Sequence, residues 1–287
     1  MNNKNAIIWF NGEFKKFSEC SISLATHGLH YGTSIFEGMR AYNWNIFKFN
    51  EHNKRLIRSG EIVDIPVPYS LEILNNVCNE ILKKNNLPNA YLRPFAWRGD
   101  ENLGVVSKKN TVNVAIMAWE WGNYYGKDKI TNGLKLCESN WVRPDPRSVS
   151  VEAKVGGNYY IGSIIKNKAS DDNYDDVLML DCRGYVAECS SSNVFFIKNN
   201  EIYTPIADCF LNGITRQTIF EIANELSIKC NEVRIKSEEL NEFQECFVTG
   251  TAAEIMPVGE IFDKYHYKNF NLTNKVRNYY LNLVNKI

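Results

Sequence analysis

Beyond residue 134 the sequence consists mainly of short apolar segments separated by turn-forming residues. The segments are only a few residues long and rich in β-branched or aromatic side chains: LKLCESNW, DVLMLD, YVAEC, NVFFIK, EIYTP, ECFVTG and EIMPVG. Only residues 158–172, residues 215–228 and the C-terminal stretch around Val276 and Tyr280 have helical spacing. Many short strands interrupted by few helices predict a barrel-like domain.

The first 121 residues alternate strand and helix patterns instead. NAIIWFNGEF predicts a β-hairpin that turns at Asn11-Gly12, and NAYLRPFAW and TVNVAIMAWEW predict two longer strands. Ser70 precedes apolar residues at helical spacing and is expected to cap that helix. Residues 122–133 are rich in Gly, Asn and Lys and predict a linker. We therefore expect an α+β chain with a small N-terminal domain (1–121), a linker (122–133) and a larger C-terminal domain (134–287).

Composition excludes several classes of function. Lys+Arg and Asp+Glu both number 33 in the 287 residues, and a formal net charge of zero argues against a nucleic-acid or polyanion partner. The eight cysteines include no Cys-x-x-Cys pair, and there are only four histidines, so we expect no metal site and no disulfide framework. Unpaired cysteines fit a reducing cytoplasm. The N-terminal apolar run AIIWF is too short for a signal or membrane segment.

Lys154 lies in EAKVGGNYYIGS, between an extended segment and a predicted helix. A lysine amine is a nucleophile only when burial or a nearby cation favours its neutral form. Such lysines form Schiff bases with aldehydes, including pyridoxal phosphate. That cofactor also needs a partner for its pyridine nitrogen, which Glu188 could supply from the end of a strand. Tyr159 could supply a phenol for its ring oxygen.

Two stretches have the composition of phosphate sites. In LNGITRQTIFEIANEL, Gly213 precedes a helix whose first turn contains Thr215, and helix N-termini favour anions. In VTGTAAEIMP, small residues after a strand would let a ligand approach the backbone. Ordinary roles explain the same residues: a turn and a helix cap, a strand bulge, and a solvated lysine. The residues alone leave both interpretations open.

Seven motifs in sequence order resemble the branched-chain amino-acid aminotransferases, which are class IV aminotransferases and fold type IV pyridoxal-phosphate enzymes. The motifs are HGLHYGTSIFEGMRAY (27–42), AYLRP (90–94), WGNYYG (121–126), AKVGGNYY (153–160), GYVAE (184–188), GITR (213–216) and GTAAE (250–254). The resemblance implies a small α/β domain followed by a pseudo-barrel domain. It also implies reversible ping-pong amino transfer between L-leucine, L-isoleucine or L-valine and 2-oxoglutarate, by a homodimer or a higher assembly of dimers.

The resemblance also assigns residues to the cofactor. Lys154 matches the lysine that holds pyridoxal phosphate covalently and moves the substrate proton. Glu188 matches the carboxylate on the pyridine nitrogen, and Tyr159 matches the phenol beside the ring oxygen. The positions that match phosphate-binding residues are Arg55, Ile214, Thr215 and Thr251.

Other positions match substrate-binding residues. The backbone N–H groups of Thr251 and Ala252 would bind the α-carboxylate, assisted by Tyr91. The apolar side-chain pocket would be walled by Phe36, Trp121, Tyr124 and Tyr159. The distal carboxylate of glutamate would be bound by Arg93, Tyr31 and Tyr124. In this family the residue that matches Tyr31 reaches the site from the neighbouring subunit.

Two alternatives and one departure accompany this interpretation. A D-amino-acid aminotransferase or an aminodeoxychorismate lyase has the same fold, although FEGMRAY and AYLRP argue against both. A non-catalytic binding or assembly protein is the alternative from another class. The family often has Gly-x-Gly-Glu-Asn after the matched glutamate, whereas this chain has Cys189-Ser190-Ser191-Ser192-Asn193. Replacing glycines restricts the backbone conformations available there.

Overall fold

The structure, a computed structural model, describes residues 4–122, 124–126 and 128–286. The chain divides into two compact units. The first contains residues up to 122 together with residues 152–158, and the second contains residues 124–151 and 159–286. The domain boundaries drawn from the sequence at residues 121 and 134 stay a prediction.

An antiparallel sheet forms the first unit. Its strands are β1 (Ile7–Phe10), β2 (Glu13–Lys16), β3 (Ser34–Phe36), β4 (Met39–Tyr42), β5 (Asn45–Ile46), β6 (Ala90–Arg98) and β7 (Val112–Glu120). They follow the order β2-β1-β7-β6-β4-β5, and β3 also pairs with β6. The predicted hairpin is confirmed, because Asn11 and Gly12 connect β1 to β2 with φ values of 48° and 97°. Asparagine and glycine tolerate this left-handed conformation best.

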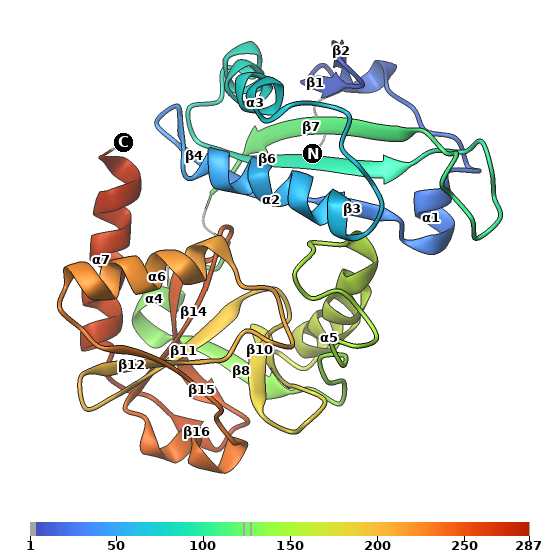
Figure 1. The fold of residues 1–287 in the computed structure, drawn as a ribbon. Helices are drawn as coiled ribbons and strands as arrows, with labels where there is room; N and C mark the ends of the chain where they lie inside the picture. Colours follow the sequence, from blue (N-terminus) through green and yellow to red (C-terminus); the bar gives the residue numbers. More distant parts are fainter. Residues whose placement is uncertain (1–3, 123, 127, 287) are drawn as a thin grey trace. The chain divides into compact units, whose positions relative to one another are not determined.

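Helices α2 (Phe49–Ile62) and α3 (Leu71–Asn85) pack against one face of this sheet (Figure 1). Ser70 caps α3 as predicted, since its Oγ accepts a hydrogen bond from Ile73 N at 3.3 Å. Two shorter elements, η1 (Phe17–Glu19) and α1 (His27–Tyr31), connect β2 to β3. Alternate strand residues such as Leu92 and Ile116 join the core beneath α2 and α3. The residues between them therefore face away from these helices.

A closed barrel forms the second unit. Its strands and their extensions are β8 (Leu134–Glu138), β9 (Asp176–Leu180), β10 (Val186–Cys189), β11 (Asn193–Lys198), β12 (Glu201–Pro205), β13 (Cys230–Val233), β14 (Glu245–Gly250), β15 (Glu254–Ile261) and β16 (Tyr265–His266). The order β10-β9-β8-β15-β14-β11 returns to β10 through the pairing of Glu188 with Asn193. The predicted barrel-like fold is therefore confirmed.

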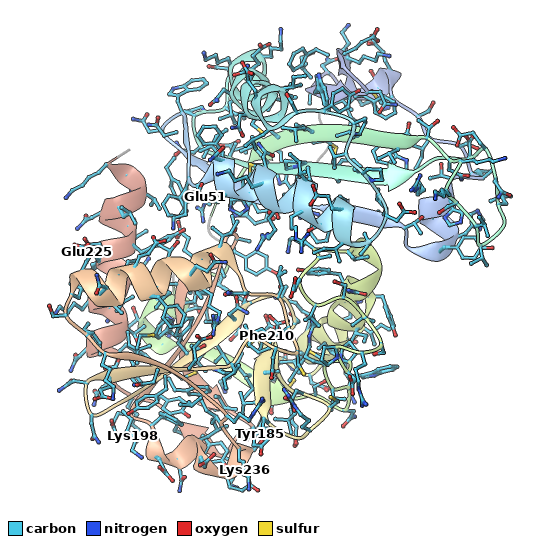
Figure 2. All side chains as sticks on the ribbon, in the orientation of Figure 1. Glu51, Tyr185, Lys198, Phe210, Glu225 and Lys236 are labelled. Atoms are coloured by element: carbon cyan, nitrogen blue, oxygen red, sulfur yellow. The ribbon has the colours of Figure 1, made fainter. Side chains whose placement is uncertain are left out.

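The helices of the second unit are α4 (Asp128–Asn132), α5 (Tyr160–Asp171), α6 (Ile214–Glu225), η3 (Ser237–Glu242) and α7 (Asn271–Asn285), and η2 (Gly156–Tyr159) leads into α5. Helix α4 lies inside the segment predicted as a linker. Val276, Tyr280 and Val284 of α7 are buried on one face. Figure 2 shows Lys198 and Lys236 at the rim of this unit and Phe210 in its interior. No helix in the described part of the chain is long and apolar enough to cross a membrane.

Gly162 allows α5 to pack closely against the turn that follows β10. A Cβ atom at this position would lie 2.6 Å from the backbone oxygen of Ser190. Helix propensity alone would make Gly162→Ala stabilising by about 1 kcal/mol. We expect the variant to lose roughly 1–3 kcal/mol instead, because a backbone atom has to move. Urea denaturation measures the difference. Ser163→Ala, at an exposed position of α5, is the control, and a Gly162→Ala protein more stable than wild type would contradict the prediction.

Candidate active site

Backbone hydrogen bonds fix Lys154 against the sheet of the first unit. Its N–H donates to Ser59 Oγ of α2 at 3.0 Å, and its carbonyl accepts from Phe36 N of β3 at 3.0 Å. The next residue, Val155, forms a β-bridge with Ile35. The Lys154 Nζ atom lies 4.6 Å from the centre of the Phe36 ring. The predicted reactive lysine therefore projects from a backbone that is held on two sides.

The two glycines after Lys154 are explained by close packing. A Cβ atom on Gly156 would lie 2.4 Å from Ser34 Oγ, and one on Gly157 would lie 3.2 Å from the carbonyl oxygen of Gly32. Gly32 ends α1 with a φ of 66°. Larger residues at 156 and 157 would push the lysine segment away from β3.

Residues predicted for substrate binding gather around the same phenylalanine. The Arg93 guanidinium carbon lies 4.7 Å from the Phe36 ring centre, and Arg93 Nη2 donates to Tyr91 Oη at 3.3 Å. Tyr91 also packs against Trp121, with ring centres 4.9 Å apart. The side chains of Lys154 and Arg93 thus lie beside the same aromatic ring, and the guanidinium charge of Arg93 favours an anionic group nearby.

Gly38 makes room for Tyr91. A Cβ atom on Gly38 would lie 1.9 Å from Tyr91 Oη, so a side chain at this position would displace the phenol. The glycine of the FEG triplet therefore has a steric function in this cluster. Tyr91 and Arg93 are two residues apart in the AYLRP motif, and both lie on the face of β6 that points away from α2 and α3.

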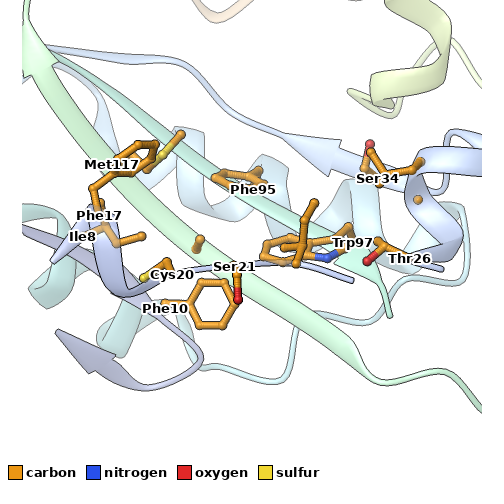
Figure 3. A pocket seen from close by; sticks show the side chains of 14 residues that line it. Ile8, Phe10, Phe17, Cys20, Ser21, Thr26, Ser34, Phe95, Trp97 and Met117 are labelled. Atoms are coloured by element: carbon orange, nitrogen blue, oxygen red, sulfur yellow. The ribbon is translucent and has the colours of Figure 1, made fainter. Parts of the chain in front are cut away.

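Farther along the same face lies an apolar groove that the sequence did not predict. Figure 3 shows Phe10, Phe95, Trp97 and Met117 lining it, and its volume is about 420 Å³. Phe95 and Trp97 follow Tyr91 and Arg93 at every second position of β6. The large side chains at these alternate positions of β6 were the sequence pattern that could have predicted the groove. The predicted substrate residues thus occupy one end of a longer aromatic face.

A buried ionic cluster lies next to the site, and the sequence did not predict it. The Glu37 carboxylate, fully buried, accepts hydrogen bonds from Arg55 Nε at 2.6 Å and Arg55 Nη2 at 2.9 Å. His52 Nδ1 lies 2.6 Å from the same carboxylate. Burial opposes the charge of Glu37, but Arg55 and His52 outweigh it and lower its pKa. Burial also lowers the pKa of His52, so the neutral ring donates Nδ1–H to Glu37.

This cluster bears on the predicted phosphate-binding role of Arg55. A guanidinium has five N–H donors, so a bidentate contact with Glu37 does not exhaust them. The contact fixes the guanidinium plane beside α2. Its phosphate-binding role stays a prediction. Alternation along β3 and β4 turns Glu37 inward with Ile35 and Met39, and this alternation was the signal for its burial.

In the second unit, Glu188 lies where the barrel closes, and two side chains contact its carboxylate. Arg143 Nη2 lies 2.9 Å from Glu188 Oε1, and Asn193 Nδ2 donates to Glu188 Oε2 at 3.1 Å. Arg143 was missed because it lies 45 residues before Glu188 in an irregular segment. Asn193 opens β11 and pairs directly with Glu188 across the barrel closure.

The two predicted phosphate stretches lie beside this carboxylate. Gly213 caps α6 with a φ of −62°, so Ile214 and Thr215 form its buried first turn. Asn193 pairs with Thr249 on its other side, and Gly250 to Glu254 form the turn between β14 and β15 that contains Thr251 and Ala252. The first N–H groups of a helix have no partner within the helix, and they suit an anion.

The serine run that replaces the family's glycines adopts a conformation that serine accommodates. Cys189 N donates to the Ser192 carbonyl at 2.8 Å, which closes a tight turn. These four residues all lie in the described part of the chain, and none of them has a positive φ. Glycine is therefore not required here by the backbone.

The three remaining predicted tyrosines lie at other places. Tyr159 caps α5, and Tyr124 Oη accepts a hydrogen bond from Lys166 Nζ at 2.9 Å. Lys166, which the sequence did not single out, also pairs with the buried Asp176 at 3.0 Å. Tyr31 is 46% exposed at the end of α1 and donates to the Leu103 carbonyl at 2.9 Å. Within each unit, the structure thus brings one group of the predicted site residues together: those around Phe36 in the first unit and those around Glu188 in the second.

Comparisons with known proteins agree with the sequence resemblance. The family model described as amino-transferase class IV matches residues 34–261. A probable branched-chain-amino-acid aminotransferase of Rickettsia bellii is 41% identical over 254 residues, which are 88% of this chain and 86% of the relative. The branched-chain-amino-acid aminotransferase of Pseudomonas aeruginosa is 37% identical over 265 residues, 91% of this chain and 86% of the relative.

Solved structures give the same result for the fold. The crystal structure of the Escherichia coli branched-chain amino acid aminotransferase has a TM-score of 0.94 and 34% sequence identity, and the match covers 99% of this chain and 96% of that one. The branched-chain amino acid aminotransferase from Thermobaculum terrenum, in its PLP-bound holo-form, has a TM-score of 0.90 at 26% identity. That match covers 99% of this chain and 95% of the other.

Acid is expected to destabilise the fold through His52. Because burial lowers its folded pKa below the ordinary value of about 6.5, the unfolded chain binds a proton there that the folded chain does not. Stability should therefore fall as pH drops below about 6.5, by up to about 1.4 kcal/mol per pH unit. Glu37, whose folded pKa is also lowered, adds to the loss below about pH 4.3.

Urea unfolding between about pH 7.5 and 5.5 measures this dependence. His52→Asn retains a donor near the Nδ1 position but does not titrate, so its stability should depend less on pH than that of wild type. His30→Asn, at an exposed position of α1, is the matched control and should retain the wild-type slope. An unchanged slope in His52→Asn would exclude His52 as the titrating group.

Proposed function

Because this chain belongs to the amino-transferase class IV family, we propose that it transfers amino groups between L-leucine, L-isoleucine or L-valine and 2-oxoglutarate. The observation that carries the proposal is the cluster of Lys154, Arg93, Phe36 and Tyr91. It combines a lysine amine, an apolar ring and a guanidinium held by a tyrosine hydroxyl. The ring could contact the side chain of leucine, and the guanidinium could bind the distal carboxylate of glutamate.

The residues of the second unit fit pyridoxal phosphate as the cofactor. Glu188 is a buried carboxylate suited to a protonated ring nitrogen. The first turn of α6, with Ile214 and Thr215, suits its phosphate, and Thr251 offers a further hydroxyl. Tyr159 would donate to the ring oxygen. When bound, the cofactor supplies the aldehyde that captures the amino group and the ring that withdraws electrons from the substrate Cα.

Lys154 would have two functions in this reaction. It would anchor the cofactor covalently through Nζ, and the released amine would take the proton from the substrate Cα. Its backbone contacts with Ser59 and Phe36 restrict where Nζ can reach. A positioned proton carrier of this kind typically contributes roughly 10²–10⁴-fold to the rate.

Substrate selection would depend on the aromatic side chains and on Arg93. Phe36, Trp121 and Tyr124 would contact the branched side chain. Arg93 would bind the distal carboxylate of glutamate, because a planar guanidinium matches a carboxylate in two parallel hydrogen bonds. The backbone N–H groups of Thr251 and Ala252 would bind the α-carboxylate that both substrates share.

We further propose that the chain works in the cytoplasm as a homodimer or as an assembly of dimers, with Tyr31 completing the site of the neighbouring subunit. Several large apolar side chains are exposed near Tyr31, on α1 and on the segments before it and around residue 105: Leu24, Leu29, Leu103, Val105 and Val106. Exposed apolar side chains grouped in this way favour a protein interface. The contact from Tyr31 to Leu103 joins these segments.

The substrate is tested with a panel of donors at saturating 2-oxoglutarate. We expect L-leucine, L-isoleucine and L-valine to be transaminated by the cofactor-loaded protein, with D-alanine and aminodeoxychorismate inactive. Lys154→Ala should lose more than about 10⁴-fold, because both the covalent bond and the proton carrier are removed. Lys168→Ala, an exposed lysine of α5, is the matched control.

Each alternative predicts a different outcome of that panel. Preference for D-alanine would indicate a D-amino-acid aminotransferase, and turnover of aminodeoxychorismate would indicate the lyase. Absence of cofactor binding and of turnover would favour a non-catalytic protein. Measurable transamination by Lys154→Ala would refute the assignment of this lysine.

The shared site is tested by subunit complementation. Tyr31→Ala and Lys154→Ala are each expected to be nearly inactive with glutamate, but a co-expressed mixture should recover about a quarter of wild-type activity. Half of randomly paired dimers are mixed, and each mixed dimer has one complete site. Tyr160→Ala, an exposed tyrosine of α5, should retain full activity alone. No recovery in mixed dimers would show that Tyr31 does not act across subunits.

A further inference from the structure

Two side chains hold the Glu188 carboxylate, one on each oxygen, and neither has yet been assigned a role. Arg143 Nη2 lies 2.9 Å from Oε1, and Asn193 Nδ2 donates to Oε2 at 3.1 Å. We propose that Arg143 and Asn193 are positioning residues that orient Glu188 toward the ring nitrogen of the cofactor. This inference rests on the proposed function and assigns it two further residues.

Arg143 is fixed by its backbone as well as by its side chain. Its N–H donates to the Leu180 carbonyl at 2.8 Å, and it forms a parallel β-bridge with Asp181. The Arg143 side chain is 13% exposed and that of Glu188 is 7% exposed. A charge pair shielded from water in this way has a stronger and more directional interaction than one at the surface. Arg143 therefore holds one oxygen of Glu188 at a defined point of the barrel.

Asn193 holds the other oxygen and connects it to the turn before α6. Its Nδ2 carries two hydrogens, and it also donates to the Leu211 carbonyl at 3.1 Å. One amide thus contacts both the carboxylate for the ring nitrogen and the turn for the phosphate. Asn193 therefore connects Glu188 directly to the segment that leads into α6.

Gly213 shows that the structure leaves space for this amide. A Cβ atom on Gly213 would lie 2.4 Å from Asn193 Oδ1. Its φ of −62° is available to any residue, so the backbone conformation does not require glycine. The requirement is steric, and it comes from Asn193. A side chain at position 213 would push the amide away from Glu188.

Two donors on different oxygens define the plane of the carboxylate. An ionised carboxylate has about four lone-pair sites, so the contacts with Arg143 and Asn193 are compatible with a further hydrogen bond from a pyridinium N–H. Supporting partners of this kind typically change ligand affinity or activity by roughly 10–100-fold when they are removed, as is known for metal-binding carboxylates. A purely structural ion pair would change stability without changing the cofactor.

The test uses Arg143→Met and Asn193→Leu in the full chain. The chain provides a matched control for each. Arg147→Met removes a 90% exposed arginine of the same segment, which pairs with Asp145. Asn231→Leu removes an amide that also donates to a glutamate, Glu201, and to a backbone carbonyl, that of Ile202.

Binding is measured with pyridoxamine phosphate, which cannot form the bond to Lys154 and therefore reports the non-covalent contacts. We expect both variants to weaken binding by roughly 10–100-fold and to shift the pH at which the visible absorption of bound pyridoxal phosphate changes. The two controls should behave as wild type in both measurements. Thermal unfolding of the cofactor-free proteins shows how much of each effect is structural.

Two results would overturn the inference. If Arg143→Met and Asn193→Leu lower the unfolding temperature but keep wild-type affinity and the wild-type pH profile, the two residues are structural only. If wild-type protein binds neither cofactor form, both this inference and the proposed function fail. Should Asn193→Leu not fold, Gly213→Ala displaces the same amide without removing it, and wild-type affinity in that variant would also exclude the role of Asn193.

Discussion

The geometry of the first unit's site depends on the two backbone hydrogen bonds of Lys154. They join the lysine segment to α2 through Ser59 and to β3 through Phe36. Each partner also belongs to the buried framework of that unit, since Ser59 is fully buried and β3 pairs with β6. The position of a flexible side chain is thus determined by a rigid sheet and helix, as a reactive group requires.

Much of the fold was predictable because its signals are local. The Asn11-Gly12 hairpin, the Ser70 cap and the short strands of the barrel each follow from a few adjacent residues. The family was also predictable, because seven motifs in order are specific even though each is short. Helix α4 was missed, since the five residues Asp128–Asn132 lie in a stretch whose composition is typical of a linker.

The site was predictable residue by residue but not as a set of contacts. Lys154, Phe36, Tyr91 and Arg93 were each identified from motifs, yet only the structure shows that the Phe36 ring lies beside the side chains of both Lys154 and Arg93. Glu37, Arg143 and Asn193 were given no role, because their partners are distant in sequence or their burial depends on strand register. Long-range contacts of this kind have no local sequence pattern. They follow from how the chain folds.

The pairing of Glu188 with Asn193 closes the barrel, and it therefore places both residues where β10 and β11 meet to complete the ring. If β10 and β11 separated there, each would expose an edge with unsatisfied N–H and C=O groups. A ligand that contacts Glu188 and the turn beside Asn193 would therefore bind only the closed ring. By mass action, such a ligand would stabilise the barrel in proportion to its concentration. The supply of the cofactor would then help determine how much of the folded protein a cell retains.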